Sequence, residues 1–399
     1  MSKADPSFTS ADPTSASMRG SNQTGVRDHN ERLVLSILRR EGALSKADIA
    51  RMTGLSAQTV SVIMRELEAD GMLLRDAPRR GRVGQPSVPM RLNPEGAYFH
   101  GVLVGRRWVE HVITDMCGAV KYRSQDIYEC PDFDALLRFC EVSFKEGVAG
   151  LSPDAQSRIA GAGLAIPGHI WEWSDDLGMD REKLLPWRDR DFQTELAQRT
   201  GYTILSQNDA SSACAAEMVF GTSTNLPSTF LHVFVGYFIG GGLVLDNRLF
   251  TGPSGNAAAI GSMPIMQTDG TIAQLIDVAS LHGLTRRVLA AGKERQRLFA
   301  ADMEWGGLED EIEDWIKELA PALAQAVATA ISLIDVPLVI IDGHMPETVR
   351  ERVTHAVNKA LDKIDCAGLV RPDIKSGTIG PLARTLGAAS LPLADQFLV

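Results

Sequence analysis

Polar side chains between residues 56 and 65 have the chemistry needed to read DNA. Amide and hydroxyl groups hydrogen-bond the edges of bases in the major groove, and an arginine one helical turn later suits a phosphate oxygen. The candidates for these contacts are Ser56, Ala57, Gln58, Thr59, Ser61 and Arg65. Their spacing places them at the start of one helix, so the sequence predicts a helix that presents a polar face to DNA.

Two short helices separated by a tight turn would position that face. Ser45 is placed to cap the first helix, with Asp48 three residues later, and Gly54 ends it. Ser56 is placed to cap the second helix, whose apolar residues recur at helical spacing: Val60, Ile63, Met64 and Leu67. An earlier apolar-periodic helix, expected over residues 30–41, would complete a three-helix core.

A basic hairpin is predicted after the second helix. MLLR leads into the turn PRRGRVGQP, which contains Arg82 and Gln85, and then into the alternating VPMRL. This order indicates a winged helix-turn-helix over residues 30–95. A structural helical hairpin with a solvated polar face would give the same two-helix pattern, but the basic hairpin favours DNA binding.

Charge is distributed unevenly along the chain. Residues 31–95 carry 11 Lys or Arg and 8 Asp or Glu, whereas the whole chain of 399 residues has a formal charge of −10. Because neutralising phosphates requires only local positive charge, this division fits a nucleic-acid contact at one end and argues against a body that wraps nucleic acid.

The sequence predicts a cytoplasmic protein without a membrane partner. No run approaches the ~20 apolar residues of a membrane span. Residues 1–29 are rich in Ser, Thr, Asp and Gly and contain no apolar segment suited to a signal peptide, so we expect a disordered tail.

The five cysteines are scattered, with no CxxC pair and no histidine at metal-ligand spacing. We therefore expect reduced core thiols, no metal and no cofactor. The cysteines are Cys117, Cys130, Cys140, Cys214 and Cys366.

Strands that alternate with helices are expected beyond residue 95. Strand-rich stretches begin at YFHGVLVG and again at LHVFVGYFIGGG, while IAGAGLAIPG, YTILSQND and VPLVIIDG read as further strands. The pattern predicts an α/β body of two similar lobes, residues 96–215 and 216–399, with a cleft between them.

Several segments, taken in order after the winged helix, resemble the ROK family of repressors, uncharacterised reading frames and sugar kinases. They are IAGAGLAIPG, QNDASSACAAE, VGYFIGGGLVLDNRLFTGPSGNAAAIGSMPI, LVIIDGH and a final GAAS. The resemblance covers nearly everything from residue 30 onward. It implies a two-lobed, actin-like and hexokinase-like body of the ATPase type.

The resemblance implies a role for Asn208 and Asp209. In the family's sugar kinases, a carboxylate at the position of Asp209 takes the proton from a sugar hydroxyl, and the repressors use the same Asn–Asp pair to hold sugar hydroxyls. An aspartate at a strand end could instead cap the following helix. We expect Asn208 and Asp209 to face a ligand.

The phosphate-binding turns depart from the kinase pattern. Where the kinases resemble DxGGT, GVLVGRR places Leu103 at the acidic position and Arg106 and Arg107 at the end, so no carboxylate remains there to organise Mg²⁺. Phe238 stands in the second turn, where a family glycine lets the backbone approach a phosphate. ATP-dependent phosphorylation is therefore not expected.

The segment that resembles the family's zinc site has lost its ligands. Ala259 replaces a glutamate and Ser262 a histidine, and no cysteine follows within MQTDGTIAQLIDVAS. The same glutamate and histidine normally contact sugar hydroxyls, so the resemblance implies an altered ligand site. It assigns Asn256 and Ser262 to that site.

Two interpretations of the ligand site remain open. Trp187 fits the family's tryptophan near the sugar, and Lys183, four residues earlier, replaces an asparagine. A cationic Lys183 and the lost carboxylate favour an acidic or phosphorylated sugar, although Lys183 could be a solvated loop residue. Alternatively, the site has lost its ligand and the protein binds DNA constitutively or under the control of a partner.

The wing departs from the family as well. Related repressors often end the wing with Gly-Arg-Pro, whose arginine could enter a narrow minor groove, but GRVGQP has Gln85 at that position. Minor-groove contact is then weaker, or Arg82 supplies it.

Together these features predict a repressor of carbohydrate uptake or metabolism genes that binds double-stranded DNA and a sugar or sugar-derived effector. A homodimer or tetramer would read a pseudo-palindromic operator. The alternative from another class is a ROK-type sugar kinase with Asp209 as its base. A pure interaction protein would show neither specific DNA binding nor a ligand.

Overall fold

The computed structural model describes residues 23–78, 88–173, 181–223, 226–267, 269–300 and 303–399. At the N-terminal end, α1 (Gln23–Glu41), α2 (Lys46–Thr53) and α3 (Ala57–Ala69) pack together, and β1 (Leu73–Arg75) pairs antiparallel with β2 (Met90–Leu92). The predicted winged helix-turn-helix is confirmed.

Local capping explains the turn between α2 and α3. The Ser45 side chain accepts a hydrogen bond from the amide of Asp48 at 3.2 Å, and the Ser56 side chain accepts one from the amide of Thr59 at 3.1 Å. Gly54 ends α2 with φ = 71°, a conformation that favours glycine. Both predicted caps are therefore confirmed.

Helix α1 begins at Gln23, so residues 23–29, which we expected in a disordered tail, are helical instead. Arg27 explains the extension, because it pairs with Glu31 one turn later at 3.0 Å and with Glu66 of α3 at 2.8 Å. The polar composition of this segment concealed a helix that is held by ion pairs.

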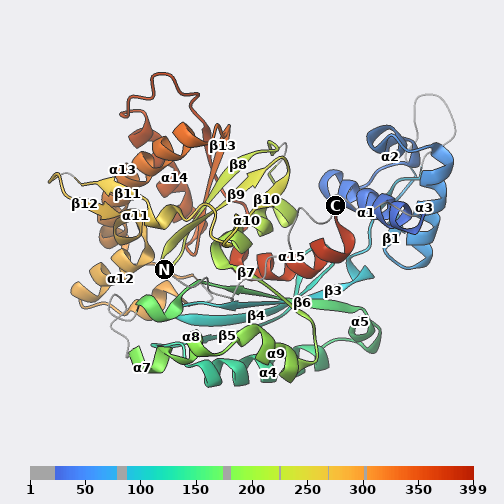
Figure 1. Ribbon diagram of the computed structural model, residues 1–399, viewed down its shortest axis with the longest axis horizontal. Coiled ribbons are helices and arrows are strands. Elements are labelled where there is room, and N and C mark those ends of the chain that lie inside the picture. The colour runs from blue at the N-terminus through green and yellow to red at the C-terminus, as the bar shows by residue number, and fades with distance from the viewer. Residues whose placement is uncertain (1–22, 79–87, 174–180, 224–225, 268, 301–302) are drawn as a thin grey trace, which may run out of the picture.

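Two five-stranded sheets form the body (Figure 1). The first has the order β5 (Val120–Ile127), β4 (Trp108–Asp115), β3 (Tyr98–Val104), β6 (Ile159–Ile166), β7 (Ile204–Asn208). The second has the order β10 (Arg248–Phe250), β9 (Ile239–Leu245), β8 (Phe230–Val235), β13 (Leu338–Gly343), β14 (Asp373–Ser376). In each sheet three antiparallel strands are extended by two parallel ones, which confirms the predicted two-lobed α/β body.

The helices surround and separate these sheets. Those that follow the strands of the first sheet in sequence are α4 (Phe133–Ala149), α5 (Pro153–Ser157), α7 (Arg181–Leu184), α8 (Pro186–Asp189), α9 (Phe192–Thr200) and α10 (Asp209–Phe220). The second half contains the small hairpin β11 (Pro264–Met266) and β12 (Ile272–Gln274), then α11 (Leu275–Ala279), α12 (Leu281–Ala290), α13 (Glu309–Leu333), α14 (Glu347–Leu361) and α15 (Ala383–Phe397). Within the described residues, every helix is too short or too polar to cross a lipid bilayer.

Helix α15 packs on the first sheet, although the predicted boundary at residue 215 placed it in the second lobe. It lies against β3 and β6 on one side and against α10 on the other (Figure 1). The close approach requires glycine: a Cβ on Gly163 would lie 1.8 Å from the carbonyl oxygen of Ala388, and one on Gly387 would lie 1.7 Å from that of Ser212. Packing therefore assigns α15 to the first lobe.

The end of α15 also completes the core of the winged helix-turn-helix. Leu393 belongs to one buried apolar cluster with Val34 and Leu38 of α1, and Phe397 packs against that cluster. Arg32 donates hydrogen bonds to the carbonyl oxygens of Ala394 and Leu398 at the end of α15. The Ala394 carbonyl also accepts from the amide of the C-cap residue Leu398 at 3.3 Å. The DNA-binding unit and the body thus share one core.

Candidate functional site

The predicted DNA-reading residues lie together at the start of α3. Ala57, Gln58 and Arg65 are exposed, whereas Thr59 and Ser61 are half-buried. The Ser56 side chain caps the helix and lies 2.8 Å from the Thr59 hydroxyl, so both hydroxyls serve the local structure. The exposed amide of Gln58 and guanidinium of Arg65 are the longest polar groups that this face offers to DNA.

Lys46 at the start of α2 was not among the predicted contacts. Its ammonium group donates to the Ser61 hydroxyl at 3.1 Å, which places a positive charge beside α3. The signal was available, since Lys46 follows directly after the predicted cap Ser45. Arg82 and Gln85 lie outside the described residues, so their contacts to a minor groove stay a prediction.

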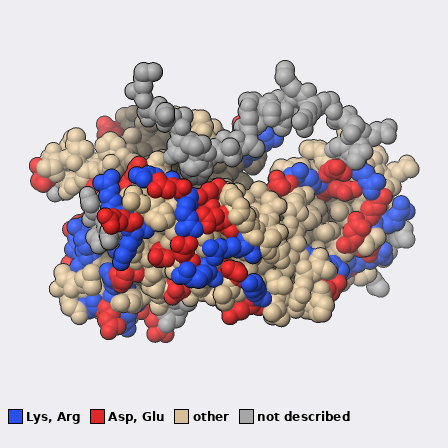
Figure 2. Space-filling view, turned by 60° about the horizontal axis from the view of Figure 1, so that its bottom comes forward, with Lys and Arg blue, Asp and Glu red and all other residues tan. Residues whose placement is uncertain are grey.

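Positive and negative side chains are mixed on one face of the body (Figure 2). On the face in Figure 2, Lys and Arg side chains of the body are interleaved with Asp and Glu side chains instead of forming one basic surface. This distribution fits a nucleic-acid contact at the winged helix-turn-helix end of the molecule.

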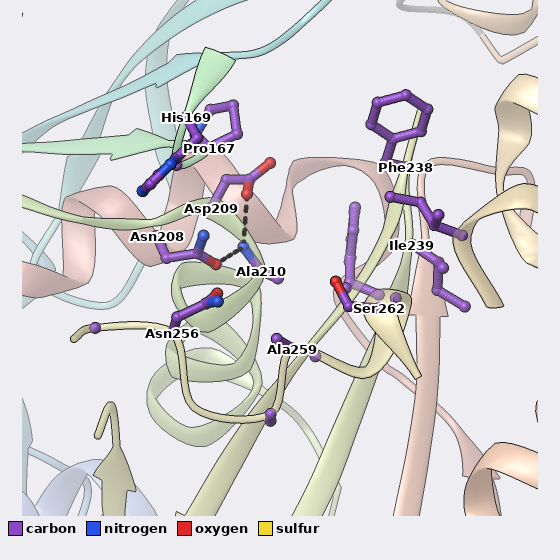
Figure 3. A pocket seen from close by; sticks show the side chains of 18 of the residues that line it. Pro167, His169, Asn208, Asp209, Ala210, Phe238, Ile239, Asn256, Ala259 and Ser262 are labelled. Atoms are coloured by element: carbon purple, nitrogen blue, oxygen red, sulfur yellow. Dashed lines mark hydrogen bonds between the residues drawn. The ribbon is translucent and has the colours of Figure 1, made fainter. Parts of the chain in front are cut away.

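A cavity of about 410 Å³ lies between the two lobes, where the ends of β6 and β7 face β9 and the loop that follows β10. Four of the five predicted ligand residues line it (Figure 3): Asn208, Asp209, Asn256 and Ser262. They come from separate parts of the chain, and the fold brings them to one space of the size of a small-molecule site.

Asn208, and not Asp209, is the N-cap of α10. Its side-chain oxygen accepts hydrogen bonds from the amides of Ala210 at 3.0 Å and Ser211 at 3.3 Å. One carboxylate oxygen of Asp209 accepts from the amide of Ala210 at 3.1 Å, and the other accepts from Nη1 of Arg384 at 2.9 Å. Asp209 therefore lines the cavity with its charge already paired.

Arg384, in the first turn of α15, was not predicted. Its side chain is only 5% exposed, and its guanidinium lies 4.7 Å from the ring centre of Trp108 and 5.1 Å from that of Phe234. Cation–π contacts and the pair with Asp209 fix it at the cavity wall. Nothing in the local sequence TLGAAS marks this arginine as a site residue.

Arg106, in the turn between β3 and β4, lines the same cavity. Its guanidinium lies 4.8 Å from the ring centre of Phe238. Burial lowers the pKa of Arg106 to about 10, so the group remains charged at neutral pH. The sequence had marked Arg106 as a lost kinase position without assigning it a contact.

The residues at the kinase positions are therefore unsuited to phosphoryl transfer. A carboxylate that is hydrogen-bonded to a buried guanidinium is poorly placed to take a proton from a sugar hydroxyl. Leu103 is fully buried within β3, and Phe238 lines the cavity at the turn before β9. Ala259 and Ser262 also line the cavity, and neither is a ligand that zinc prefers.

Lys183 lies apart from this cavity. It is exposed on α7 and does not contribute to the cavity lining, so the structure does not bring it to the other predicted ligand residues. Trp187 lines an adjoining cavity of about 380 Å³, and its indole nitrogen donates to the carbonyl oxygen of Pro131 at 2.7 Å. His169 lines both cavities and was missed, although it follows the predicted strand in IPGH.

One buried group within the described residues places three possible metal ligands near one another: Glu217, His232 and Asp342. Both carboxylates are already engaged, since Glu217 accepts from the amide and hydroxyl of Thr378 and Asp342 accepts from the amide of Gly380. These bonds hold the turn that precedes α15. Their direct role is structural.

Sequence models of known families match both parts of the chain. The model of the ROK family matches residues 144–394, more than half of the chain, and that of the winged helix-turn-helix DNA-binding family matches residues 27–73. The chain belongs to the ROK family. Its ROK body carries an N-terminal DNA-binding domain, as the sequence predicted.

Relatives and a solved structure extend this result. The chain is 24% identical to the uncharacterised protein y4fQ of Sinorhizobium fredii, over 92% of this chain and 91% of that protein. It is 25% identical to the xylose repressor of Bacillus subtilis over 61% of this chain. The matched region spans 62% of the repressor, less than two thirds of its length. A ROK family transcriptional regulator, described as a homologue of the E. coli MLC protein, matches its fold with a TM-score of 0.64 at 20% identity, over 93% of this chain and 97% of that one.

Proposed function

We propose that this ROK protein is a sequence-specific DNA-binding repressor of carbohydrate uptake or metabolism genes, controlled by a sugar or sugar derivative in the cleft cavity. The observation that carries the proposal is the physical continuity between the DNA-binding core and the cavity through α15. Similarity to a xylose repressor supports the assignment to carbohydrate genes. A protein that reads genomic DNA acts in the cytoplasm, the location expected from the sequence.

Helix α15 provides the route for control. Its first turn places Arg384 in the cavity, and its last turns place Leu393 and Phe397 against α1. A ligand that binds one arrangement of the lobes more tightly than another would shift α15 and with it the winged helix-turn-helix. Repression and release then correspond to two positions of α3.

Symmetry determines the expected operator. A homodimer, or a tetramer built from dimers, would present two α3 helices to successive major grooves. We therefore expect a pseudo-palindromic site whose half-sites lie one helical turn apart or a multiple of it.

The proposal is tested by selecting fragments of the source organism's genomic DNA with the purified protein at physiological salt, where non-specific phosphate contacts are weak. We expect enrichment of a palindromic site beside transport or sugar-metabolism genes. Gln58→Ala should cost roughly 1–3 kcal/mol on that site and little on random DNA. Equal recovery of all fragments would contradict the proposal.

The alternative, a sugar kinase, is favoured by one observation: Asp209 does line the cavity at the position of the kinase base. Its pairing with Arg384 argues against this chemistry. A coupled assay for ADP release with ATP and simple sugars decides the matter, and sustained turnover that Asp209→Asn abolishes would establish the kinase.

A further inference from the structure

We infer that the ligand of the cleft cavity is anionic and that its carboxylate or phosphate group binds Arg384 and Arg106. The inference rests on the proposed function, because it specifies the chemical class of the effector. The cation that the sequence attributed to Lys183 is supplied instead by two arginines from distant parts of the chain.

Arg384 lies at the cavity wall and has hydrogen-bonding capacity that the described residues leave unused. Nη1 donates to Asp209, whereas the buried Nε and Nη2 have no hydrogen-bond partner among the described residues. Buried donors without acceptors are costly, so a ligand that supplies acceptors there gains their full interaction. Nε and Nη2 lie on one edge of the planar group, the edge that binds a carboxylate or phosphate through two parallel hydrogen bonds.

This edge is held in place before any ligand arrives. The rings of Trp108 and Phe234 lie 4.7 and 5.1 Å from the guanidinium carbon, and Asp209 anchors the opposite corner of the group. A preorganised donor pair loses little side-chain entropy on binding. The geometry is that of a receptor for a planar or tetrahedral oxyanion.

The charged side chains around the inner cavity are mainly positive, which suits an anionic ligand. Arg384 and Arg106 contribute two positive charges, and Asp209 contributes one negative charge. Glu172 also lines the cavity, but its side chain is 60% exposed and paired with His169 at 3.0 Å, so solvent screens it. A bound anion would place a negative charge beside both guanidinium groups.

The rest of the lining suits hydroxyl groups. Asn208, Asn256 and Ser262 offer amide and hydroxyl groups around the same space. A sugar acid or a sugar phosphate combines both features, with hydroxyls toward these residues and its anionic group on the arginines.

The test uses the full chain and four probes at equal ionic strength: glucose, glucuronate, glucose 6-phosphate and inorganic phosphate. Calorimetric titration and the thermal unfolding midpoint report binding. We expect at least one anionic probe to bind more tightly than glucose and to raise the midpoint relative to chloride. A preference for glucuronate would identify a carboxylate, and a preference for either phosphate probe would identify a phosphate.

Matched variants make the test specific. Arg106→Gln should weaken binding of the anionic probe roughly tenfold or more, because one charge-assisted contact is lost. Arg107→Gln is the control, since Arg107 is the adjacent arginine but does not line the cavity. Arg384→Gln should also weaken binding of the anionic probe. If Arg384→Gln fails to fold, Arg106→Gln still tests the inference.

Three results would overturn the inference: no anionic probe binds better than chloride, Arg106→Gln binds the anion as well as the natural chain does, or glucose binds as tightly as its anionic counterparts. Fragment selection without any ligand tests the proposed function separately. A protein that selects an operator and releases it with neutral sugars alone would retain the proposed function and lose this inference.

Discussion

Two buried aspartate–arginine pairs in the body differ in what surrounds them. Asp342 is fully buried, and its carboxylate accepts from the amides of Gly343 at 2.9 Å and Gly380 at 3.0 Å, with Nη1 of Arg350 at 3.4 Å. Asp209 pairs with Arg384 at the wall of an open cavity. The first pair is enclosed in the protein interior, whereas the second faces a space of about 410 Å³.

Comparing the two pairs shows how a ligand-binding site can be distinguished from a structural ion pair. Both arginines have buried nitrogens for which the described part of the chain supplies no hydrogen-bond partner: Nε in Arg350, and both Nε and Nη2 in Arg384. Only Arg384 of these two lines the cleft cavity. Burial and pairing therefore occur in structural and functional pairs alike, and what distinguishes the second is unused donors beside a space that a ligand can enter.

The largest effect is expected from Asp342→Ala. Removing one partner of an enclosed pair leaves Arg350 charged and buried, which should cost about 3–5 kcal/mol in the free energy of unfolding. Urea unfolding followed by circular dichroism measures this loss. A cost below about 1 kcal/mol would show that the pair is not structural, and the comparison would fail.

The second prediction concerns pH. Burial raises the pKa of Asp342 to about 6, so the native state holds this proton more tightly than the unfolded state does. Stability should therefore fall as the pH rises from about 4 to about 6, by on the order of 2 kcal/mol from this group. The natural chain and Asp342→Asn, which cannot titrate there, are unfolded across this range. Parallel stability curves for the two proteins would contradict the prediction.

The smallest effect on stability is expected from Asp209→Ala, about 1 kcal/mol, because removal of this side chain from the cavity wall lets water reach the guanidinium of Arg384. Its functional effect should be larger: ligand should no longer change operator affinity, since Arg384 loses its anchor. Unfolding and DNA-binding titrations with and without the anionic probe measure both. A stability loss equal to that of Asp342→Ala would remove the distinction between the pairs.

Local signals in the sequence were sufficient for the winged helix-turn-helix. Ser45 and Ser56 cap helices as predicted, because capping and helical periodicity depend on neighbouring residues. The start of α1 was missed because its ion pair to Glu66 lies across 39 residues. Local composition carries no information about such a partner.

In the body, the family resemblance indicated where the ligand residues converge. Asn208, Asp209, Asn256 and Ser262 line one cavity, but Lys183 does not. Arg384 was missed because it meets Asp209 across 175 residues, through the packing of α15 on the first sheet. That packing depends on glycines such as Gly163, whose role becomes visible only when the facing helix is known.

The junction between α1 and α15 has a consequence for how the protein is made. Arg32 and the carbonyl of Leu398 are 366 residues apart, so the earliest described helix obtains its last contacts from the final turns of the body. During synthesis the apolar face of α1 cannot pack against α15 until α15 has left the ribosome. Contacts of such long range therefore form late in folding. Specific operator binding should therefore require chains in which α15 has been synthesised and packed, and a nascent chain that lacks α15 should not bind the operator.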